Sequence, residues 1–453
     1  MSTAKKVWLV LGAVGLLVCG GGSFIILQFV DFPQAANRLP QVEKRAVAAG
    51  VPMTAQELLG PLPMDDGSLA NAAMANDHLK SSISQDLKAA ESSNPDWKQA
   101  QKTLSDYGKD LNFAKALSDL PVTTLDLDYD LGADALFPHF AQLKYKSRLL
   151  CLAALVHAHQ GKFEESAHEL ARVRKIGTMA ARVPNLIGLL VRLSIDAILY
   201  DAAQNCVALA VNSPSGLAEF QSCDLVGDLP YDIDLSFRGE AFCAVTTCRN
   251  FKKLGNPGGV TSPSPTYVPP DPKSLKRSGM PTGTLARAYM ARSLEYWALV
   301  FEERKKHPGD LLANGRFMDR LRDDMDSRKG LSYWVANAFL PSGVQTAKSV
   351  LGGQARQRTY AALIKVLEFR QKSKRFPKTL DEAGVTLKDP FDGSPLRYSV
   401  KDGQARVWSL GADGVDNGGS PVNVAPSGKD KLFDIVAAYP PVFKSTGSDK
   451  AKT

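Results

Sequence analysis

The run from Val7 to Val30 contains no charged residue, and it constrains the chain more than any other stretch. About 20 predominantly apolar residues are enough to cross the hydrocarbon layer of a membrane. Lys5 and Lys6 precede the run and Asp31 follows it. Because positive charges mark the cytoplasmic side of a span, we expect a transmembrane helix with a cytoplasmic N-terminus. The alternative is a cleaved signal peptide, whose apolar core is normally shorter, at about 7–15 residues.

The composition is that of a globular chain, not of a disordered or multi-spanning one. Its 453 residues suit two or three domains of roughly 100–200 residues each. Apolar residues make up 44% and charged residues 23%, both near the average for soluble domains. The net charge of +8 is not gathered into a basic stripe with interleaved aromatics. We therefore expect no nucleic-acid partner, and instead a membrane contact through the N-terminal helix and protein partners.

The middle of the chain has the apolar spacing of amphipathic helices. The segments Leu143–His159 and Phe163–Arg182 flank a turn and predict a helical hairpin. A further helix is expected over Leu186–Ala203, where Arg192 and Asp196 are four residues apart and so lie on one face, suited to an ion pair. Additional helices are expected at Leu285–Lys306, at Phe317–Met325, at Tyr333–Ala347 with a break at Pro341, and at Gln354–Lys372.

Two acid-rich stretches contain carboxylates that are candidates for metal binding or catalysis. Residues 125–131 alternate apolar and acidic side chains, which predicts an extended segment. Their aspartates match the first ligands of an EF-hand loop, but Leu131 replaces the required glycine. Asp224–Glu240 predicts a loop leading into a helix. The carboxylates of Asp126–Asp134 or of Asp224–Glu240 would serve an envelope metal-dependent hydrolase, which we keep as one alternative function.

Near the C-terminus the pattern changes from helical to β. Leu396–Val400 and Ala405–Ser409 alternate as strands around Lys401–Gln404, which predicts a β-hairpin. The following run, Trp408–Gly419, intersperses glycines with carboxylates. Calcium takes six to eight oxygen ligands, and glycines allow a short loop to fold back and supply them. The alternative is that these residues only form tight turns.

Three motifs in this region occur in a fixed order after a helix. They are Arg-Phe-Pro at 375–377, Asp-Pro-Phe-x-Gly-x-Pro at 389–395 and Ser-Leu-Gly-Ala-Asp-Gly at 409–414. In order and spacing, residues 354–439 resemble the globular domain of the type II secretion major pseudopilin. In that family a long helix packs on a small antiparallel sheet whose last loop binds calcium.

The resemblance implies a calcium site in this chain. Its ligands would be the Leu410 carbonyl and the carboxylates of Asp413, Asp416, and Asp430 or Asp434. Two features depart from the family: Ser420–Lys429 lacks the acidic continuation, and Val7–Val30 lacks the cleavable leader and the glutamate that follows it. The resemblance is therefore to the module and not to a whole pseudopilin.

We expect a mainly α fold with an N-terminal transmembrane helix, a helical-hairpin bundle domain and a small C-terminal α+β pseudopilin-like module with an antiparallel hairpin. The expected organisation, in chain order, is a cytoplasmic tip and anchor at 1–30, a stalk and helical domain at 31–253, a Pro/Gly-rich linker or excursion at 254–284, further helices packing with the helical domain at 285–353, the pseudopilin-like helix and β module at 354–443, and a flexible tail at 444–453. The stalk is expected to carry short helices at 42–49 and 54–59.

No catalytic motif is present: the sequence has no Gly-x-Ser-x-Gly, no His-Glu-x-x-His and no phosphate-binding Gly-rich loop with a lysine. The wider layout resembles uncharacterised single-pass bacterial envelope proteins. This group brings no established activity. From the charges around the apolar run we expect an inner-membrane protein with most of the chain in the periplasm, acting by interaction or assembly. A further alternative is an accessory component of a type II secretion or pilus-like system.

Overall fold

The computed structural model describes residues 31–60, 72, 82–123, 127–134, 137, 139–222, 233–250, 283–328, 331–338, 340–420 and 434–441. The predicted membrane run at 7–30, nearly all of the Pro/Gly-rich segment 254–284 and the tail 444–453 lie outside the described residues. The chain divides into two compact units. Unit 1 comprises Met1–Gly60, Leu127–Ala135 and Arg238–Thr346, and unit 2 comprises Pro61–Asp126, Leu136–Phe237 and Ala347–Thr453.

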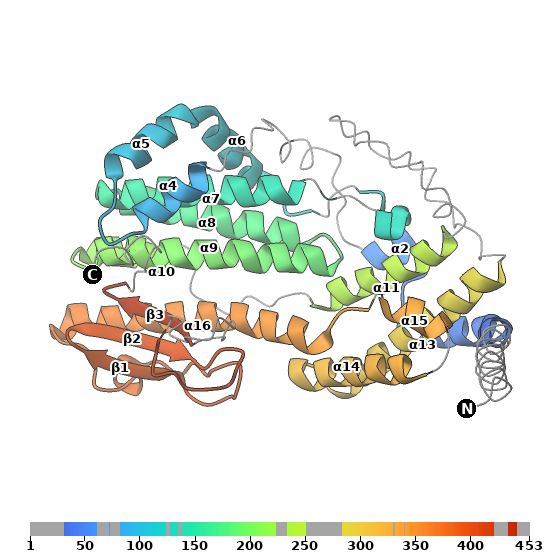
Figure 1. Ribbon diagram of the computed structural model, residues 1–453. Coiled ribbons are helices and arrows are strands. Elements are labelled where there is room, and N and C mark those ends of the chain that lie inside the picture. Colours follow the sequence, from blue (N-terminus) through green and yellow to red (C-terminus); the bar gives the residue numbers. More distant parts are fainter. Residues whose placement is uncertain are drawn as a thin grey trace, which may run out of the picture. The chain divides into compact units, whose positions relative to one another are not determined.

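The described structure is mainly helical with one small antiparallel sheet, as the sequence predicts (Figure 1). Within the described part of the chain, no helix combines the length and the apolar character needed to cross a membrane.

Unit 1 is helical. Residues 31–49 form one helix, which we call the Asp31 helix; it is longer than the short helix expected at 42–49. The other described elements are α2 (Ala55–Leu59), the 3-10 helix η1 (Tyr129–Asp134), most of α11 (Ile233–Arg249), α13 (Thr284–Lys306), α14 (Leu311–Ser327), α15 (Leu331–Ala338) and the beginning of α16 (Gly343–Ser373).

The last helix begins at Gly343 and not at Gln354, where the apolar pattern becomes clear. The carboxylate of Asp319 on α14 explains this start, because it accepts hydrogen bonds from the backbone N–H groups of Gly343 (2.8 Å) and Val344 (3.2 Å). Such a cap satisfies donors that have no partner inside the helix. Gly315 permits the approach, since a Cβ there would lie 2.7 Å from the Gly343 carbonyl oxygen.

The extended segment predicted for residues 125–131 is wrong from Tyr129 onward, where η1 begins. The Asp128 carboxylate accepts from the backbone N–H of Asp130 (3.1 Å), a local bond that favours a turn over a strand. The Asn250 amide then donates to the Asp130 carbonyl oxygen (2.6 Å). The alternating pattern therefore reflects a turn held against α11 and not a strand.

Unit 2 is built around the packed helices α7 (His139–His159), α8 (Phe163–Ala181) and α9 (Leu186–Ala210) (Figure 1). The hairpin predicted from the sequence is confirmed in α7 and α8, with Gly161 at positive φ in the turn. Around it lie α4 (Ser82–Ala90), α5 (Trp97–Asp106), α6 (Gly108–Asp119) and α10 (Pro214–Ser222).

The predicted ion pair on α9 is present and buried. Arg192 Nε lies 2.8 Å from Asp196 Oδ2, and both side chains are at most 5% exposed. Arg192 Nη1 also donates to the Thr178 hydroxyl on α8 at 2.7 Å. The bond from Arg192 to Thr178 joins α8 to α9. Removing one member of the ion pair would leave an uncompensated buried charge.

The C-terminal part of unit 2 combines α16 with a three-stranded antiparallel sheet, in the order β1 (Arg397–Lys401), β2 (Gln404–Ser409) and β3 (Ile435–Tyr439). Ala362 and Val366 of α16 pack against Ala405 and Val407 of the sheet. The Gln204 side chain of α9 accepts from the Ala438 N–H of β3 at 3.2 Å. The module is therefore packed on the bundle of its own unit.

The start of α9 approaches the end of α8 closely at Gly188. A Cβ there would lie 2.7 Å from the Ala180 carbonyl oxygen and 2.8 Å from that of Val183. We expect Gly188→Ala to lower the free energy of unfolding by about 1–3 kcal/mol through overpacking. Gly108→Ala is the matched control in the same unit, because a Cβ at that helical position meets nothing within 4 Å. Urea denaturation of both variants checks this; equal stabilities would contradict the close approach.

Candidate functional site

The candidate site is the loop that follows β2 and leads into β3, at the ends of these strands in the C-terminal sheet. β2 is the central strand and pairs with β1 on one side and β3 on the other. The predicted hairpin is confirmed, with Asp402 and Gly403 at positive φ in its turn. The loop begins at Leu410, directly after β2, and the described chain resumes at Asp434, directly before β3. Both ends of the loop are thus held by the same sheet.

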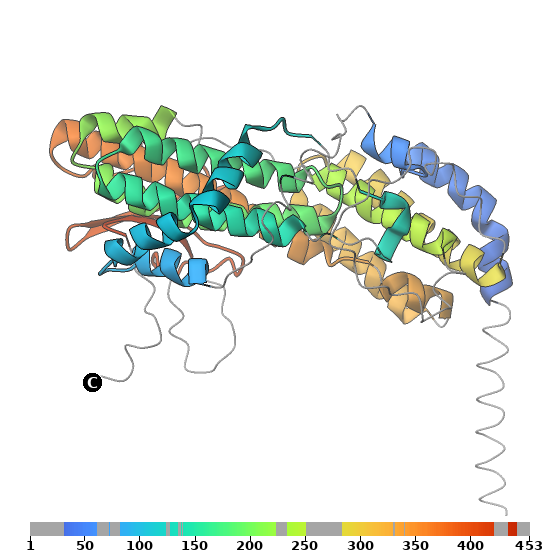
Figure 2. The same cartoon turned by 90° about the horizontal axis from the view of Figure 1, so that it is seen from above.

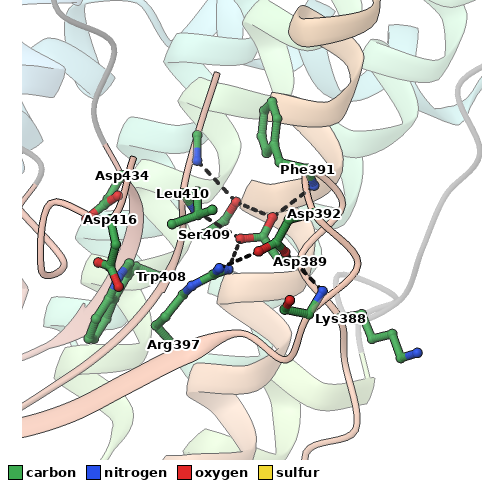
Figure 3. A network of polar contacts seen from close by, with 12 residues as sticks. Lys388, Asp389, Phe391, Asp392, Arg397, Trp408, Ser409, Leu410, Asp416 and Asp434 are labelled. Atoms are coloured by element: carbon green, nitrogen blue, oxygen red, sulfur yellow. Dashed lines mark hydrogen bonds and ion pairs between the residues drawn. The ribbon is translucent and has the colours of Figure 1, made fainter. Parts of the chain in front are cut away.

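A buried carboxylate fixes where the loop begins. The Asp389 side chain is 0% exposed, and its Oδ1 accepts from the Ser409 hydroxyl at 2.8 Å. Its Oδ2 accepts from the Leu410 backbone N–H at 2.9 Å and pairs with the Arg397 guanidinium. These contacts converge on one carboxylate in Figure 3. A charge in this position is tolerated because it is both paired and hydrogen-bonded.

The Asp-Pro-Phe-x-Gly-x-Pro motif builds the turn that presents this carboxylate. Asp389 Oδ1 also accepts from the Phe391 N–H at 2.9 Å, so the two oxygens of Asp389 receive four donors in total. Its backbone N–H donates to the Ser394 carbonyl oxygen (2.7 Å), and its carbonyl oxygen accepts from the Gly393 N–H (2.9 Å). The motif is therefore a rigid turn that reaches across to the end of β2.

Arg397 joins this turn to β1. Its guanidinium contacts both Asp389 and the neighbouring Asp392. Burial opposes ionisation of Asp392, but the hydrogen bonds from Arg397 and from the Ser394 N–H outweigh it, so the pKa of that carboxyl is lowered. Arg397 thus pairs with two carboxylates, and one of them, that of Asp389, is fully buried.

The predicted ligands Asp413 and Asp416 are exposed and make local turns in the loop. Asp413 Oδ1 accepts from the Val415 N–H at 3.1 Å. Asp416 Oδ1 accepts from the Gly418 N–H and from the Trp408 indole N–H, both at 2.9 Å. The indole contact draws the loop back over β2, which allows Asp416 to face the start of β3.

The predicted ligand Asp434 is the unusual member of the set, because it is only 4% exposed. Its Oδ2 accepts from the backbone N–H groups of Asn417 (3.0 Å) and Gly419 (2.8 Å). Its Oδ1 is buried and has no hydrogen-bond partner among the described residues. Figure 3 draws Asp434 next to Asp416 and away from the Asp389 cluster.

The electrostatics around Asp434 follow from this burial. Burial raises the pKa of the Asp434 carboxyl; the backbone hydrogen bonds lower it in part, and the negative charges of Asp416 and Asp413 raise it further. Both Asp413 and Asp416 therefore disfavour the charged form of Asp434. A group held in this way favours a proton or a cation, either of which would compensate the charge.

The structure brings some of the sequence-predicted ligands together and leaves others apart or undescribed. Asp416 lies next to Asp434 in Figure 3, whereas Asp413 accepts from the Val415 N–H within its own turn. Leu410 is only 8% exposed, and its N–H is tied to Asp389. Asp430 lies outside the described residues. No group of three or more His, Cys, Asp or Glu side chains in the described ranges is gathered tightly enough to hold a metal ion, so an ion here would need carbonyl or water oxygens as well.

Sequence reasoning missed Asp389, Arg397 and Trp408 as parts of this site. Their contacts with the loop span 20 and 21 residues for Asp389 and 8 residues for Trp408. The one available signal was the Asp-Pro-Phe motif, which marks a turn that begins at Asp389. Periodicity carries no information on where that side chain points.

Several carboxylates of the two acid-rich stretches, including Asp126, Asp224, Asp228 and Asp232, lie outside the described residues. Those that the structure describes form no group of three that could hold a metal ion. A cleft of about 560 Å³ lies in unit 2 between the end of α9, α10 and the end of α16. Two of its glutamines bond across it: the Gln371 amide donates to the Val211 carbonyl oxygen (2.7 Å), and the Gln221 amide donates to Glu368. The cleft is part of the packing of α10 on α16.

Comparison of the chain with models of protein families, with curated proteins and with solved structures found no match.

We expect Asp389→Asn to lower the free energy of unfolding by about 3 kcal/mol or more, because it leaves part of a buried ion pair unmatched and turns an amide donor toward other donors. Hydrogen exchange read by mass spectrometry should show faster exchange across residues 397–410. Ser409→Ala is a milder variant that removes one hydrogen bond and should cost about 1 kcal/mol.

The control for this prediction is Asp402→Asn in the hairpin turn. Asp402 is exposed and sits at φ +50, a conformation that Asn also tolerates, so the change should stay within about 0.5 kcal/mol. If Asp389→Asn and Asp402→Asn give the same exchange pattern, Asp389 does not hold the start of the loop.

A second prediction concerns Asp434 in the absence of calcium. Because the folded chain raises the pKa of this carboxyl, the folded state binds its proton more tightly than the unfolded chain does. The ionised group therefore costs stability as pH rises above the ordinary aspartate pKa of about 3.9. With a chelator present, Asp434→Asn should be more stable than the parent protein at pH 7, and the difference should shrink toward pH 4. Melting curves at several pH values test this, and a parent protein that is the more stable at pH 7 would refute it.

Proposed function

We propose that this protein is a bacterial envelope protein, anchored in the inner membrane by the Val7–Val30 run, that acts by interaction or assembly through its exposed helical and β surfaces. The positive residues before the run and Asp31 after it support a cytoplasmic N-terminus and a periplasmic location for the rest. No reaction is proposed, because the described side chains converge on no catalytic arrangement.

The proposal includes a calcium ion that stabilises the C-terminal module. The observation that carries it is the Asp434 carboxylate, which is buried, has one oxygen without a hydrogen-bond partner among the described residues, and is destabilised in its charged form by Asp413 and Asp416. A buried carboxylate in this state is unfavourable unless a cation compensates it. Calcium suits oxygen ligands of this kind.

The residues that would hold the ion come from both ends of the loop. Asp434 lies at the start of β3, while Asp413 and Asp416 follow β2. The Leu410 carbonyl, which the family resemblance implies as a ligand, belongs to the residue that Asp389 holds in place through its N–H. When bound, calcium would supply the positive charge that these carboxylates lack. It would thereby close the loop between β2 and β3.

A second candidate function is an accessory component of a type II secretion or pilus-like system. The specific observation in its favour is the order of elements in the module: a long helix, a turn, a hairpin, and a loop leading into a third antiparallel strand. This is the arrangement that the resemblance to the major pseudopilin implies. Co-purification with secretion components from native membranes would favour this function over a general assembly role.

Calcium should raise the melting temperature of the purified full-length protein. A ligand that binds only the native state adds about 2.7 kcal/mol of stability at a free concentration of 100 times its Kd. Asp434→Asn should abolish the calcium-dependent shift, and Asp413→Ala should reduce it. Melting curves in calcium, in magnesium and in a chelator measure the effect.

Asp402→Asn serves again as the matched control, since this aspartate lies in the same module but at the far end of the hairpin. It should retain the full calcium shift. A parent protein that melts at the same temperature in calcium and in a chelator rules out the ion, while leaving the anchored-protein proposal intact.

A further inference from the structure

The Asp31 helix and α13 run side by side in unit 1 and in the same direction. Arg38 pairs with Glu295 at 2.9 Å and Arg45 pairs with Glu302 at 2.6 Å, and in both pairs the partners are 257 residues apart. Because the sequence separation stays constant along the contact, the two helices are parallel. Exposed pairs of this kind contribute less than about 1 kcal/mol each, so they report the register more than they stabilise it.

The start of the Asp31 helix is held more firmly. The Asp31 carboxylate accepts from the Ser332 hydroxyl at 2.6 Å and from the Ser332 backbone N–H at 3.3 Å. It also pairs with the Arg292 guanidinium at 3.2 Å, and the two side chains are 12% and 8% exposed. This guanidinium in turn lies 3.9 Å from the centre of the Tyr333 ring. Asp31 is therefore tied into unit 1 through α13 and α15.

The first turn of α13 extends past Asp31. Phe32 meets Tyr289 edge to face, with ring centroids 5.8 Å apart, so these two residues lie at one level. Leu285 precedes Tyr289 by one turn, or about 6 Å along a parallel helix. In Figure 2 the dark blue Asp31 helix and the yellow beginning of α13 meet at the same end. Leu285 therefore lies beyond Asp31, the first described residue of the Asp31 helix.

We propose that this end of unit 1, where Leu285, Arg328 and Tyr333 surround the clamped Asp31 and which is here called the Asp31 face, rests on the lipid surface of the membrane. The inference deepens the proposed function, since it depends on Val7–Val30 being the anchor. Asp31 follows that run directly in the sequence and is clamped into the face, so no described segment separates the face from the run.

The chemistry of the Asp31 face suits a membrane interface. Leu285 is 37% exposed, a large aliphatic side chain at the tip of α13. Tyr333 is half-buried, and its hydroxyl lies 3.3 Å from Arg328 Nη1. Tyrosines and long basic side chains are enriched at the level of lipid headgroups, where one end of the residue is apolar and the other is hydrated. The lipid surface is thus the occupant that fits this end.

The test compares two exposed aliphatic positions in unit 1. An environment-sensitive fluorescent amino acid replaces Leu285 in one variant and Val47, which is 54% exposed, in the other. Val47 lies 16 residues after Asp31, or about 24 Å along the helix. Both full-length variants are reconstituted into phospholipid vesicles whose headgroups carry a nitroxide quencher. Circular dichroism confirms that both variants fold.

We expect the lipid quencher to act at least about twofold more strongly at position 285 than at position 47, because about 24 Å of helix separates the latter from the membrane. Equal quenching in vesicles that retain the protein overturns the Asp31 face proposal alone. So does a label at 285 that is shielded from aqueous iodide without being quenched by lipid, since a protein partner would then cover it. Failure of the protein to float with the vesicles overturns the anchor and, with it, this inference.

Discussion

The C-terminal module depends on the buried Asp389 carboxylate. It accepts from its own turn, from Arg397 of β1, and from Ser409 and Leu410 at the end of β2. A fully buried charge is tolerated only when its hydrogen-bonding capacity is filled, and four donors fill that of Asp389. This one group therefore decides where the hairpin ends and where the following loop begins.

The contrast between Asp389 and Asp434 separates a structural carboxylate from a candidate ligand. Both are at most 4% exposed and both belong to the same small sheet region. Asp389 has a cationic partner in Arg397, whereas the described residues give Asp434 two backbone N–H groups, and the charges of Asp413 and Asp416 repel it. The first has its hydrogen-bonding capacity filled without a ligand, whereas a proton or a cation would compensate the charge of the second. Two carboxylates of the same residue type thus differ because their surroundings differ.

Much of the fold was predictable from short-range patterns. The α7 and α8 hairpin, the Arg192–Asp196 pair and the β1–β2 hairpin all follow from spacings of a few residues. Predictions failed where a contact from elsewhere overrides the local pattern. Residues 129–131 end an alternating run typical of a strand, but they belong to the 3-10 helix η1, which Asn250 holds. The start of α16 is set by Asp319 on another helix, before its apolar pattern begins.

By itself the sequence determined the helical class, the hairpin, the ligand candidates in the loop and the apolar run that motivates an anchor. These depend on periodicity, turn chemistry and composition, which act over a few residues. Only the tertiary structure decided that Asp389 holds the loop, that Asp434 is buried with one oxygen lacking a partner in the described chain, and that Asp31 is clamped to Arg292 and Ser332. Such contacts join residues from 15 to about 300 positions apart, and burial arises only once those distant segments have packed.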